Sequence, residues 1–139
     1  MATPEQERNT ERLRRGMATW ASGDVDGTLS TLTEDVEVVV PAEVGNPGTF
    51  RGHDEVMEWM RQWDEAWEEF ESEIAEVVPV GERHVVATMR QSARGRGSGV
   101  AVDRDIGWVV GFRGELCEFL SLQETPELGL ELARTPAGS

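Results

Sequence analysis

The sequence WVVGFRGELCEFLSL, residues 108–122, contains two strand-forming runs that flank a tight turn at Arg113-Gly114. A glycine turn between runs of alternating apolar residues is typical of a β-hairpin. Working outward from this hairpin, the chain keeps the period of two that strands show, back to Phe70. An antiparallel meander of four strands is therefore predicted, over residues 70–80, 84–94, 100–113 and 115–124.

The N-terminal half has helical spacing instead. Leu13, Met17 and Trp20 recur on one face of a first helix that ends near Ala21. Asp24 is suited to cap a short second helix. A third helix, with apolar residues on one side, is predicted over residues 52–67.

The remaining segments complete a single α+β domain over residues 1–139. VEVVV, residues 36–40, predicts a strand, because β-branched residues are enriched in strands. Pro41 and the glycines and prolines of 45–48 predict a loop after it. The tail predicts one more helical turn from Thr125 through Leu132, and residues 1–9 and 134–139 are expected to be disordered.

Composition excludes several classes of partner. The chain carries 27 acidic and 13 basic residues, and its formal charge of −14 would repel nucleic acid and anionic lipid surfaces. No run approaches the ~20 apolar residues that cross a bilayer. A single cysteine, Cys117, and the lack of a secretory signal pattern predict a cytoplasmic protein.

Stretches that together cover most of the chain carry a family resemblance. They are DVEVVVP (35–41), GTFRGHDEVMEWM (48–60), RQSARGRGSGV (90–100) and the hairpin itself, which continues into ETPELGLELA (124–133). In these stretches the chain resembles the SnoaL-like branch of the nuclear transport factor 2-like superfamily. The resemblance implies a cone-shaped α+β barrel, in which three N-terminal helices pack against a curved, mostly antiparallel sheet around a pocket. It also implies a homodimer through the outer face of the sheet.

The superfamily includes ketosteroid isomerase, limonene epoxide hydrolase and polyketide cyclases, together with proteins that only bind. Carried over residue by residue, the isomerase's base position falls on Val40 and its partner acid on Trp108. The hydrolase's arginine falls on Arg90, but its acid positions fall on Ser92 and Ser121. Valine, tryptophan and serine cannot replace those acids in proton transfer, so catalytic residues remain unknown.

These assignments depend on strand register, since one inserted residue turns the other face of a strand inward. The favoured register sends Trp108, Phe119 and Cys117 inward and the acids toward water. The opposite register would make pocket carboxylates of Glu37, Asp103 or Asp105, and Glu118.

The remaining candidates suggest an apolar ligand. Trp20, Trp63 and Trp108 could form an aromatic wall, although core packing also explains tryptophans. Arg90 either meets a ligand oxygen in the pocket or pairs with an acid on the exposed face. The predicted ligand-binding set is Val40, Arg90, Ser92, Trp108, Phe119 and Ser121, with Trp20 and Trp63.

Neither cofactor nor metal is expected, because His53 and His84 lack metal-ligand spacing to each other or to Cys117. Two functions remain open. One is a small-molecule pocket protein that binds a hydrophobic metabolite, whether or not it has isomerase, cyclase or epoxide hydrolase-like activity. The other is a non-catalytic ligand-binding, accessory or scaffold protein.

Overall fold

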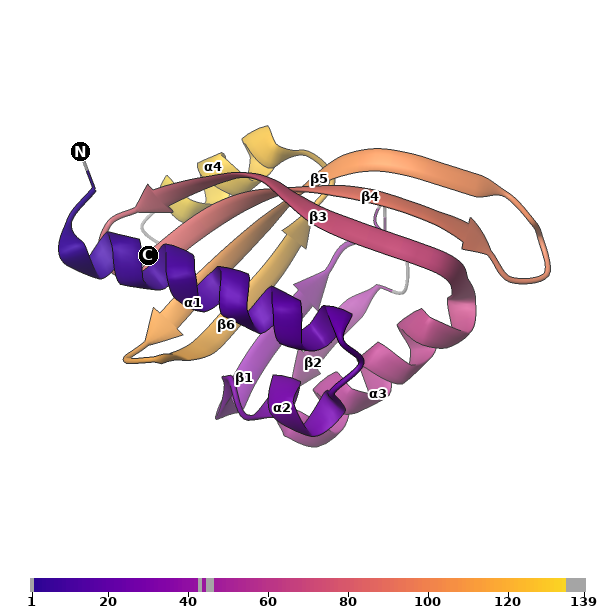
Figure 1. The fold of residues 1–139 in the computed structure, drawn as a ribbon, viewed down its shortest axis with the longest axis horizontal. Helices are drawn as coiled ribbons and strands as arrows, with labels where there is room; N and C mark the ends of the chain where they lie inside the picture. Colours follow the sequence, from indigo (N-terminus) through magenta and orange to yellow (C-terminus); the bar gives the residue numbers. More distant parts are fainter. Residues whose placement is uncertain (1, 43, 45–46, 135–139) are drawn as a thin grey trace.

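A computed structural model describes residues 2–42, 44 and 47–134 of the chain (Figure 1). Its elements follow the predicted order. They are α1 (Pro4–Ala21), α2 (Val25–Leu29), β1 (Leu32–Val40), β2 (Gly48–Arg51), α3 (Gly52–Ala66), β3 (Trp67–Val80), β4 (His84–Gly95), β5 (Ala101–Arg113), β6 (Leu116–Gln123) and α4 (Pro126–Arg134).

All six strands form one curved sheet in the order β2-β1-β6-β5-β4-β3. β1 and β6 are parallel, whereas the other neighbours are antiparallel. The predicted α+β architecture, with three N-terminal helices against a mostly antiparallel sheet, is confirmed. Figure 1 shows α1 crossing one face of the sheet, while α4 lies against the other face.

Alternation along the strands separates two apolar clusters. The main core lies between the sheet and the first three helices and includes Trp108 and Val110 of β5. Val109, which lies between them on the strand, points the other way and packs with Val86 and Ala133 beneath α4. Because successive strand residues face opposite sides, these two clusters define the inner and outer faces of the sheet.

The N-terminus differs from its prediction. Residues 1–9 were expected to be disordered, but α1 begins at Pro4, and Asn9 is 1% exposed. Thr3 and Gln6 form a capping box that satisfies two free backbone N–H groups at the start of the helix. At the other end Arg134 closes α4, and residues 135–139 lie outside the described residues.

β2 was not predicted. Its four residues begin at Gly48, the last residue of the segment that the sequence assigned to a loop, and residues 45–46 of that segment lie outside the described part. β2 pairs with β1 from Glu37↔Arg51 to Val40↔Gly48. A four-residue edge strand has too short a pattern to show a period, so only its pairing partner defines it.

Among the described residues, no helix is long and apolar enough to cross a membrane.

Candidate functional site

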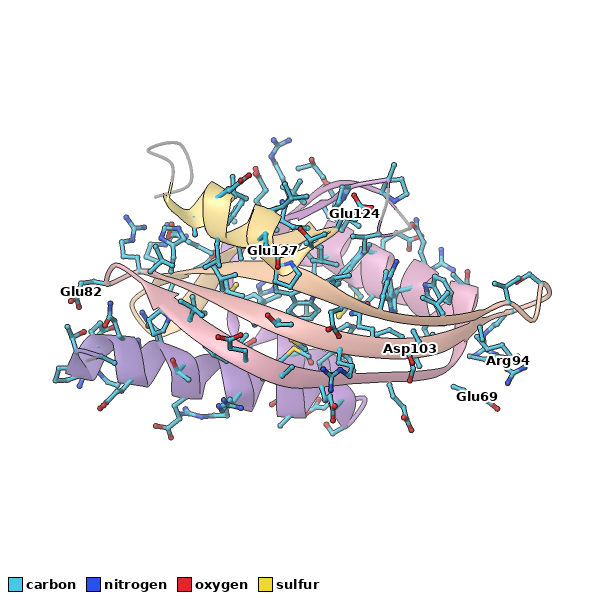
Figure 2. All side chains as sticks on the ribbon, turned by 90° about the horizontal axis from the view of Figure 1, so that it is seen from above. Glu69, Glu82, Arg94, Asp103, Glu124 and Glu127 are labelled. Carbon is cyan, nitrogen blue, oxygen red and sulfur yellow. The ribbon has the colours of Figure 1, made fainter. Side chains whose placement is uncertain are left out.

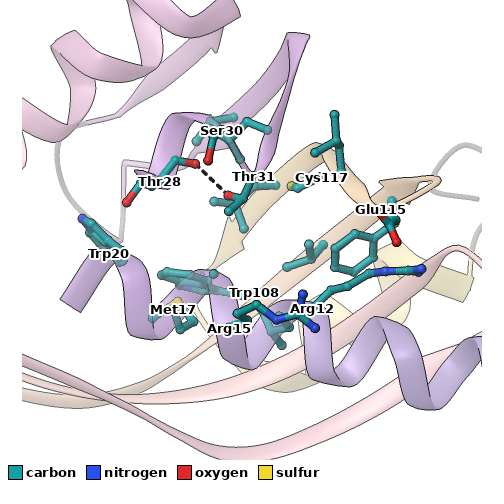
Figure 3. A pocket seen from close by; sticks show the side chains of 18 of the residues that line it. Arg12, Arg15, Met17, Trp20, Thr28, Ser30, Thr31, Trp108, Glu115 and Cys117 are labelled. Atoms are coloured by element: carbon teal, nitrogen blue, oxygen red, sulfur yellow. Dashed lines mark hydrogen bonds between the residues drawn. The ribbon is translucent and has the colours of Figure 1, made fainter. Parts of the chain in front are cut away.

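A cavity of about 460 Å³ opens between α1, the α2–β1 connection, α3 and the inner face of β5 and β6 (Figure 3). That volume lies within the range of small-molecule sites. Its deeper wall consists of apolar side chains from helix and sheet: Leu13, Met17, Trp20, Leu32, Val38, Val56, Trp59, Met60, Trp108, Val110, Phe112, Cys117 and Leu120.

Three tryptophans dominate this wall. The ring centroids of Trp20 and Trp108 lie 5.6 Å apart, and those of Trp20 and Trp59 lie 6.3 Å apart. Trp59 and Trp108 are each 3% exposed, and the indole N–H of each has no hydrogen-bond partner. Both nitrogens are themselves buried, so the indoles present apolar surface to the cavity.

The mouth of the cavity is polar. Arg8, Arg12 and Arg15 of α1 lie along it, with Glu11 and Glu115, and three hydroxyl-bearing residues, Thr28, Ser30 and Thr31, also line the cavity. Figure 3 shows Arg12 and Arg15 on one side of the opening and Thr28, Ser30 and Thr31 on the other.

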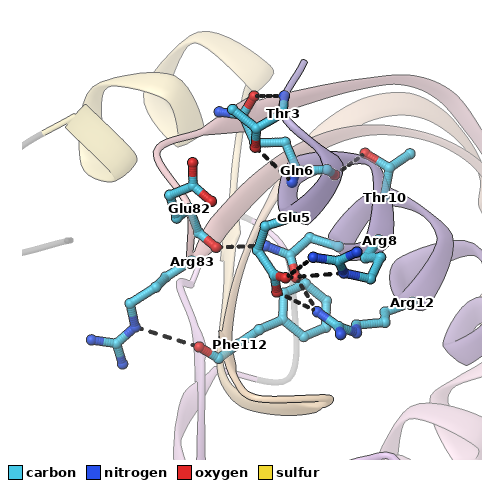
Figure 4. Close-up of polar contacts among 10 residues, drawn as sticks. Thr3, Glu5, Gln6, Arg8, Thr10, Arg12, Glu82, Arg83 and Phe112 are labelled. Atoms are coloured by element: carbon cyan, nitrogen blue, oxygen red, sulfur yellow. Dashed lines mark hydrogen bonds and ion pairs between the residues drawn. The ribbon is translucent and has the colours of Figure 1, made fainter.

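A hydrogen-bond network holds Arg12 in place (Figure 4). Its Nη1 donates to Asn9 Oδ1 at 2.7 Å and to Glu5 Oε1 at 2.8 Å. Arg12 and then Arg8, by their hydrogen bonds, lower the pKa of the Glu5 carboxyl. The Arg12 side chain is only 13% exposed, so little solvent screens its charge at the mouth.

The only thiol of the chain also lines the cavity. Cys117 is 8% exposed, and burial raises its pKa to about 12. The neutral thiol is a poor nucleophile, so Cys117 contributes apolar surface to this wall.

The structure divides the sequence-predicted site residues between several places. Trp20 and Trp108 line the cavity. Val40 is 3% exposed in the main core and does not line the cavity. Trp63 is also buried in the core, but it lines a second hollow on the far side of Trp20.

Arg90 and Ser92 belong to the predicted ligand-binding set but lie outside the cavity, and for Arg90 the structure shows the second alternative, the surface ion pair. Met89 and Gln91 face the core at 0% and 2% exposure, so their neighbours Arg90 and Ser92 face outward. Arg90 lies 3.3 Å from Asp105 and 3.9 Å from Glu73, in exposed ion pairs. The outer face near it is charged, and Figure 2 shows Arg94, Glu69 and Asp103 on the exterior.

Phe119 and Ser121 also fail to reach the cavity, and a β-bulge is the reason. Gly111 pairs with Phe119 while Phe112 pairs with Cys117, so Glu118 is the extra residue in β6. The bulge leaves Cys117 facing inward but turns Phe119 and the residues after it by one position. Phe119 therefore packs in the cluster under α4, and Ser121 pairs with outward-facing Val109.

The opposite register supplies no carboxylate to the cavity either. Glu37 pairs with Arg51, and Glu118 pairs with Arg83 and Arg113. Asp103 and Asp105 are exposed.

The sequence reasoning missed the arginines of the mouth. Arg8, Arg12 and Arg15 follow one another at spacings of four and three, which places them on one face of a helix. That signal was available but lay partly in a segment expected to be disordered.

No group of histidine, cysteine, aspartate or glutamate side chains within the described residues could hold a metal ion.

The chain is similar to proteins of known family and known structure. Residues 13–116 match the family described as SnoaL-like domain. None of the curated proteins matches the chain significantly.

Solved structures share the fold at low sequence identity. A nuclear transport factor 2-like protein of unknown function from Burkholderia pseudomallei is 20% identical, with a TM-score of 0.76 over 92% of this chain and 98% of that one. TerC co-crystallized with polyporic acid is 21% identical, with a TM-score of 0.74 over 92% and 99%. A putative SnoaL-like polyketide cyclase from Jannaschia sp. CCS1 is 17% identical, with a TM-score of 0.73 over 98% and 99%. The predicted cone fold is thereby confirmed.

Proposed function

The chain belongs to the SnoaL-like domain family, and from the chemistry of its cavity we propose that it binds a flat, hydrophobic small molecule and retains it unchanged. The observation that carries this proposal is the separation of polar from apolar groups. Apolar side chains form the deep wall, and the charged side chains gather on α1 and the β5–β6 turn at the mouth. Such a site takes up an apolar body and orients it by a few polar contacts.

The polar groups of the ligand would lie at the mouth. The hydroxyl oxygens of Thr28, Ser30 and Thr31 line the cavity there and can accept a hydrogen bond from a ligand hydroxyl. An acidic group at the end of the ligand would lie near Arg12 and Arg15 at the mouth. A flat ring system with oxygens on its rim and one anionic end fits both requirements.

The positions of the titratable groups favour binding of the ligand without conversion over a reaction that needs proton transfer. A general acid or base must reach the reacting atom within hydrogen-bond distance. Glu11 is 73% exposed and lies 3.4 Å from Arg15, and Glu115 is exposed on the β5–β6 turn. Neither acid belongs to the deep wall.

The structural neighbours support an aromatic, polyketide-like ligand. The TerC structure contains polyporic acid, and the Jannaschia protein is described as a putative polyketide cyclase. An isomerase, cyclase or hydrolase acting on such a compound is the second candidate. It is favoured by the Arg12 guanidinium, which is only 13% exposed at the mouth and could stabilise a developing oxyanion.

One experiment separates the two functions. Polyporic acid is titrated into the protein while tryptophan fluorescence is followed, and the ligand is then recovered and analysed by liquid chromatography and mass spectrometry. We expect saturable quenching and recovery of the unchanged compound. Trp108→Leu should weaken binding at least threefold, whereas Ser121→Ala, on the outer face, should leave it unchanged. If the protein forms an isomeric or hydrated product catalytically, the proposed binding function is wrong and the protein is an enzyme. The absence of saturable binding would contradict a ligand of this class.

The homodimer expected from the resemblance also remains a proposal. α4 covers part of the outer sheet face, and ion pairs of Arg90 with Asp105 and Glu73 occupy another part. Sedimentation equilibrium at several concentrations tests it, and a constant monomer mass would reject it. The cytoplasmic location likewise stays a prediction.

A further inference from the structure

A second hollow, of about 1040 Å³, lies between the end of α1, α2, the outer side of α3 and the start of β3. Met17, Trp20 and Met60 belong to both linings and separate this groove from the cavity described above. The groove plays no part in the proposed function, so an inference about it stands independently.

Four aromatic rings form the floor of the groove. Phe70 lies edge-on to Trp63, with ring centroids 5.4 Å apart and planes at 90°. Trp20 lies 6.1 Å from Phe70, and Trp67 lies 6.0 Å from Trp63. Trp20, Trp67 and Phe70 keep part of their surface exposed. Exposed ring faces carry negative electrostatic potential, which attracts cations as well as apolar groups.

Carboxylates surround this aromatic floor. The lining contains seven acids and two arginines: Asp24, Asp54, Glu58, Asp64, Glu68, Glu69 and Glu71, with Arg61 and Arg96. Arg61 pairs with Glu58, and Arg96 lies 3.7 Å from Glu68.

The basic side chains near the groove do not neutralise all of its carboxylates. Arg94 lies 3.4 Å from Glu69, and Asp24 caps the Gly27 N–H. Within the described part of the chain, the carboxylates of Asp54, Asp64 and Glu71 form no ion pair with a basic side chain. The groove therefore has an uncompensated negative charge next to open aromatic faces.

We propose that this groove binds a small organic cation, an ammonium carrying methyl or longer alkyl groups. The alkyl groups contact the rings of Trp20, Trp67 and Phe70, and the charge lies toward the carboxylates of Asp64 and Glu71, where α3 ends and β3 begins. A bare metal ion does not match this arrangement, because no group of acids in the described residues could hold one. A neutral ligand would gain nothing from the negative charge of these exposed carboxylates.

The test uses choline and its uncharged isostere, 3,3-dimethyl-1-butanol, so that only the charge differs. The five tryptophans provide five indole N–H signals, which single Trp→Phe variants assign. We expect choline to shift the signals of Trp63 and Trp67 in a saturable manner and to leave that of Trp108 in place. The isostere should bind about 2- to 30-fold more weakly, the range that cation–π contacts span.

Two sets of variants localise the effect. The pair Asp64→Asn with Glu71→Gln should weaken choline binding at least threefold. The control pair Glu73→Gln with Asp103→Asn removes the same charge from the outer face and should change binding less than twofold. Trp67→Phe should keep part of the affinity that Trp67→Leu loses, with the remaining indole signals reporting that both variants are folded.

Equal binding of choline and its isostere would overturn the proposal. Equal weakening by the two charge pairs would overturn it as well, since the effect would then come from net charge alone. A choline shift confined to Trp59 and Trp108 would place the cation in the other cavity and would also contradict the proposal.

Discussion

Arg12 Nη1 donates a hydrogen bond of 2.7 Å to the side-chain oxygen of Asn9, one turn earlier in α1. Asn9 in turn donates from Nδ2 to the carbonyl oxygen of Glu82 at 2.9 Å. One buried amide thus attaches α1 to the β3–β4 turn and orients a guanidinium at the cavity mouth (Figure 4).

Replacing Asn9 should therefore destabilise the protein. Asn9→Ala leaves the Glu82 carbonyl without its donor and Arg12 with Glu5 as its one remaining acceptor, and the loss of buried hydrogen bonds costs about 1–3 kcal/mol. Urea unfolding measures this change. Arg14→Ala, on the exposed side of the same helix, is the control and should stay within about 0.5 kcal/mol of the parent protein. Equal stability of the two variants would show that Asn9 does not anchor the helix.

Replacing Glu69 with glycine should stabilise the folded protein. Glu69 is the one non-glycine residue in the described chain with a positive φ, 54°, and it lies in a bulge of β3. A left-handed backbone conformation costs an L-residue about 1–2 kcal/mol, which glycine would not have to overcome. Part of this gain is lost because glycine is more flexible in the unfolded chain. Glu69→Gly should raise the free energy of unfolding by about 0.5 kcal/mol. Glu73→Gly, at an ordinary strand position, should lower it, and a loss of stability in both would refute the strain at Glu69.

The thiol of Cys117 should be unreactive in the folded protein. Its pKa is raised by burial to about 12 from 9.0, so at pH 8 the thiolate fraction falls about a thousandfold. Ellman's reagent should label it only after unfolding, and prompt labelling at pH 8 without denaturant would contradict its burial.

The same shift predicts a pH dependence of stability. Because the folded-state pKa lies above the unfolded one, the unfolded chain loses the proton first as pH rises. The contribution of Cys117 is complete below about pH 9 and is lost progressively toward pH 12. Urea unfolding of the parent protein and of Cys117→Ala, each at pH 8 and at pH 10, isolates this contribution to the free energy of unfolding. Only the parent protein should lose it between the two pH values.

Sequence periodicity predicted the meander well, because each of these strands has one face toward the core. Trp108 was correctly placed on the inner face, since alternation from the hairpin turn reaches it without interruption. The same counting failed for Ser121, because the bulge at Glu118 turned the strand over. A bulge inserts a residue that no apolar pattern marks, so only the pairing with β5 reveals it.

The orientation of Arg90 was open for a different reason. An arginine in a strand is compatible with a pocket or with a surface ion pair, and the choice depends on acids far away in sequence. Here Asp105 lies directly opposite on β5, and Glu73 lies directly opposite on β3. These cross-strand pairs became visible only once the register was known.

Filling the cavity should abolish ligand binding there. Gly16 lines the cavity, and an added Cβ there would meet only Thr31 Oγ1, at 3.9 Å. Gly16→Leu should therefore fold, because leucine favours the helical conformation of α1 more than glycine does. Its side chain should then occupy the space of the ligand. Binding of 8-anilinonaphthalene-1-sulfonate, a flat apolar molecule with one anionic end, is titrated against the parent, Gly16→Leu and Arg14→Leu. We expect one saturable site, at which Gly16→Leu weakens binding at least tenfold and Arg14→Leu leaves it unchanged. Undiminished binding to Gly16→Leu would contradict ligand binding in this cavity.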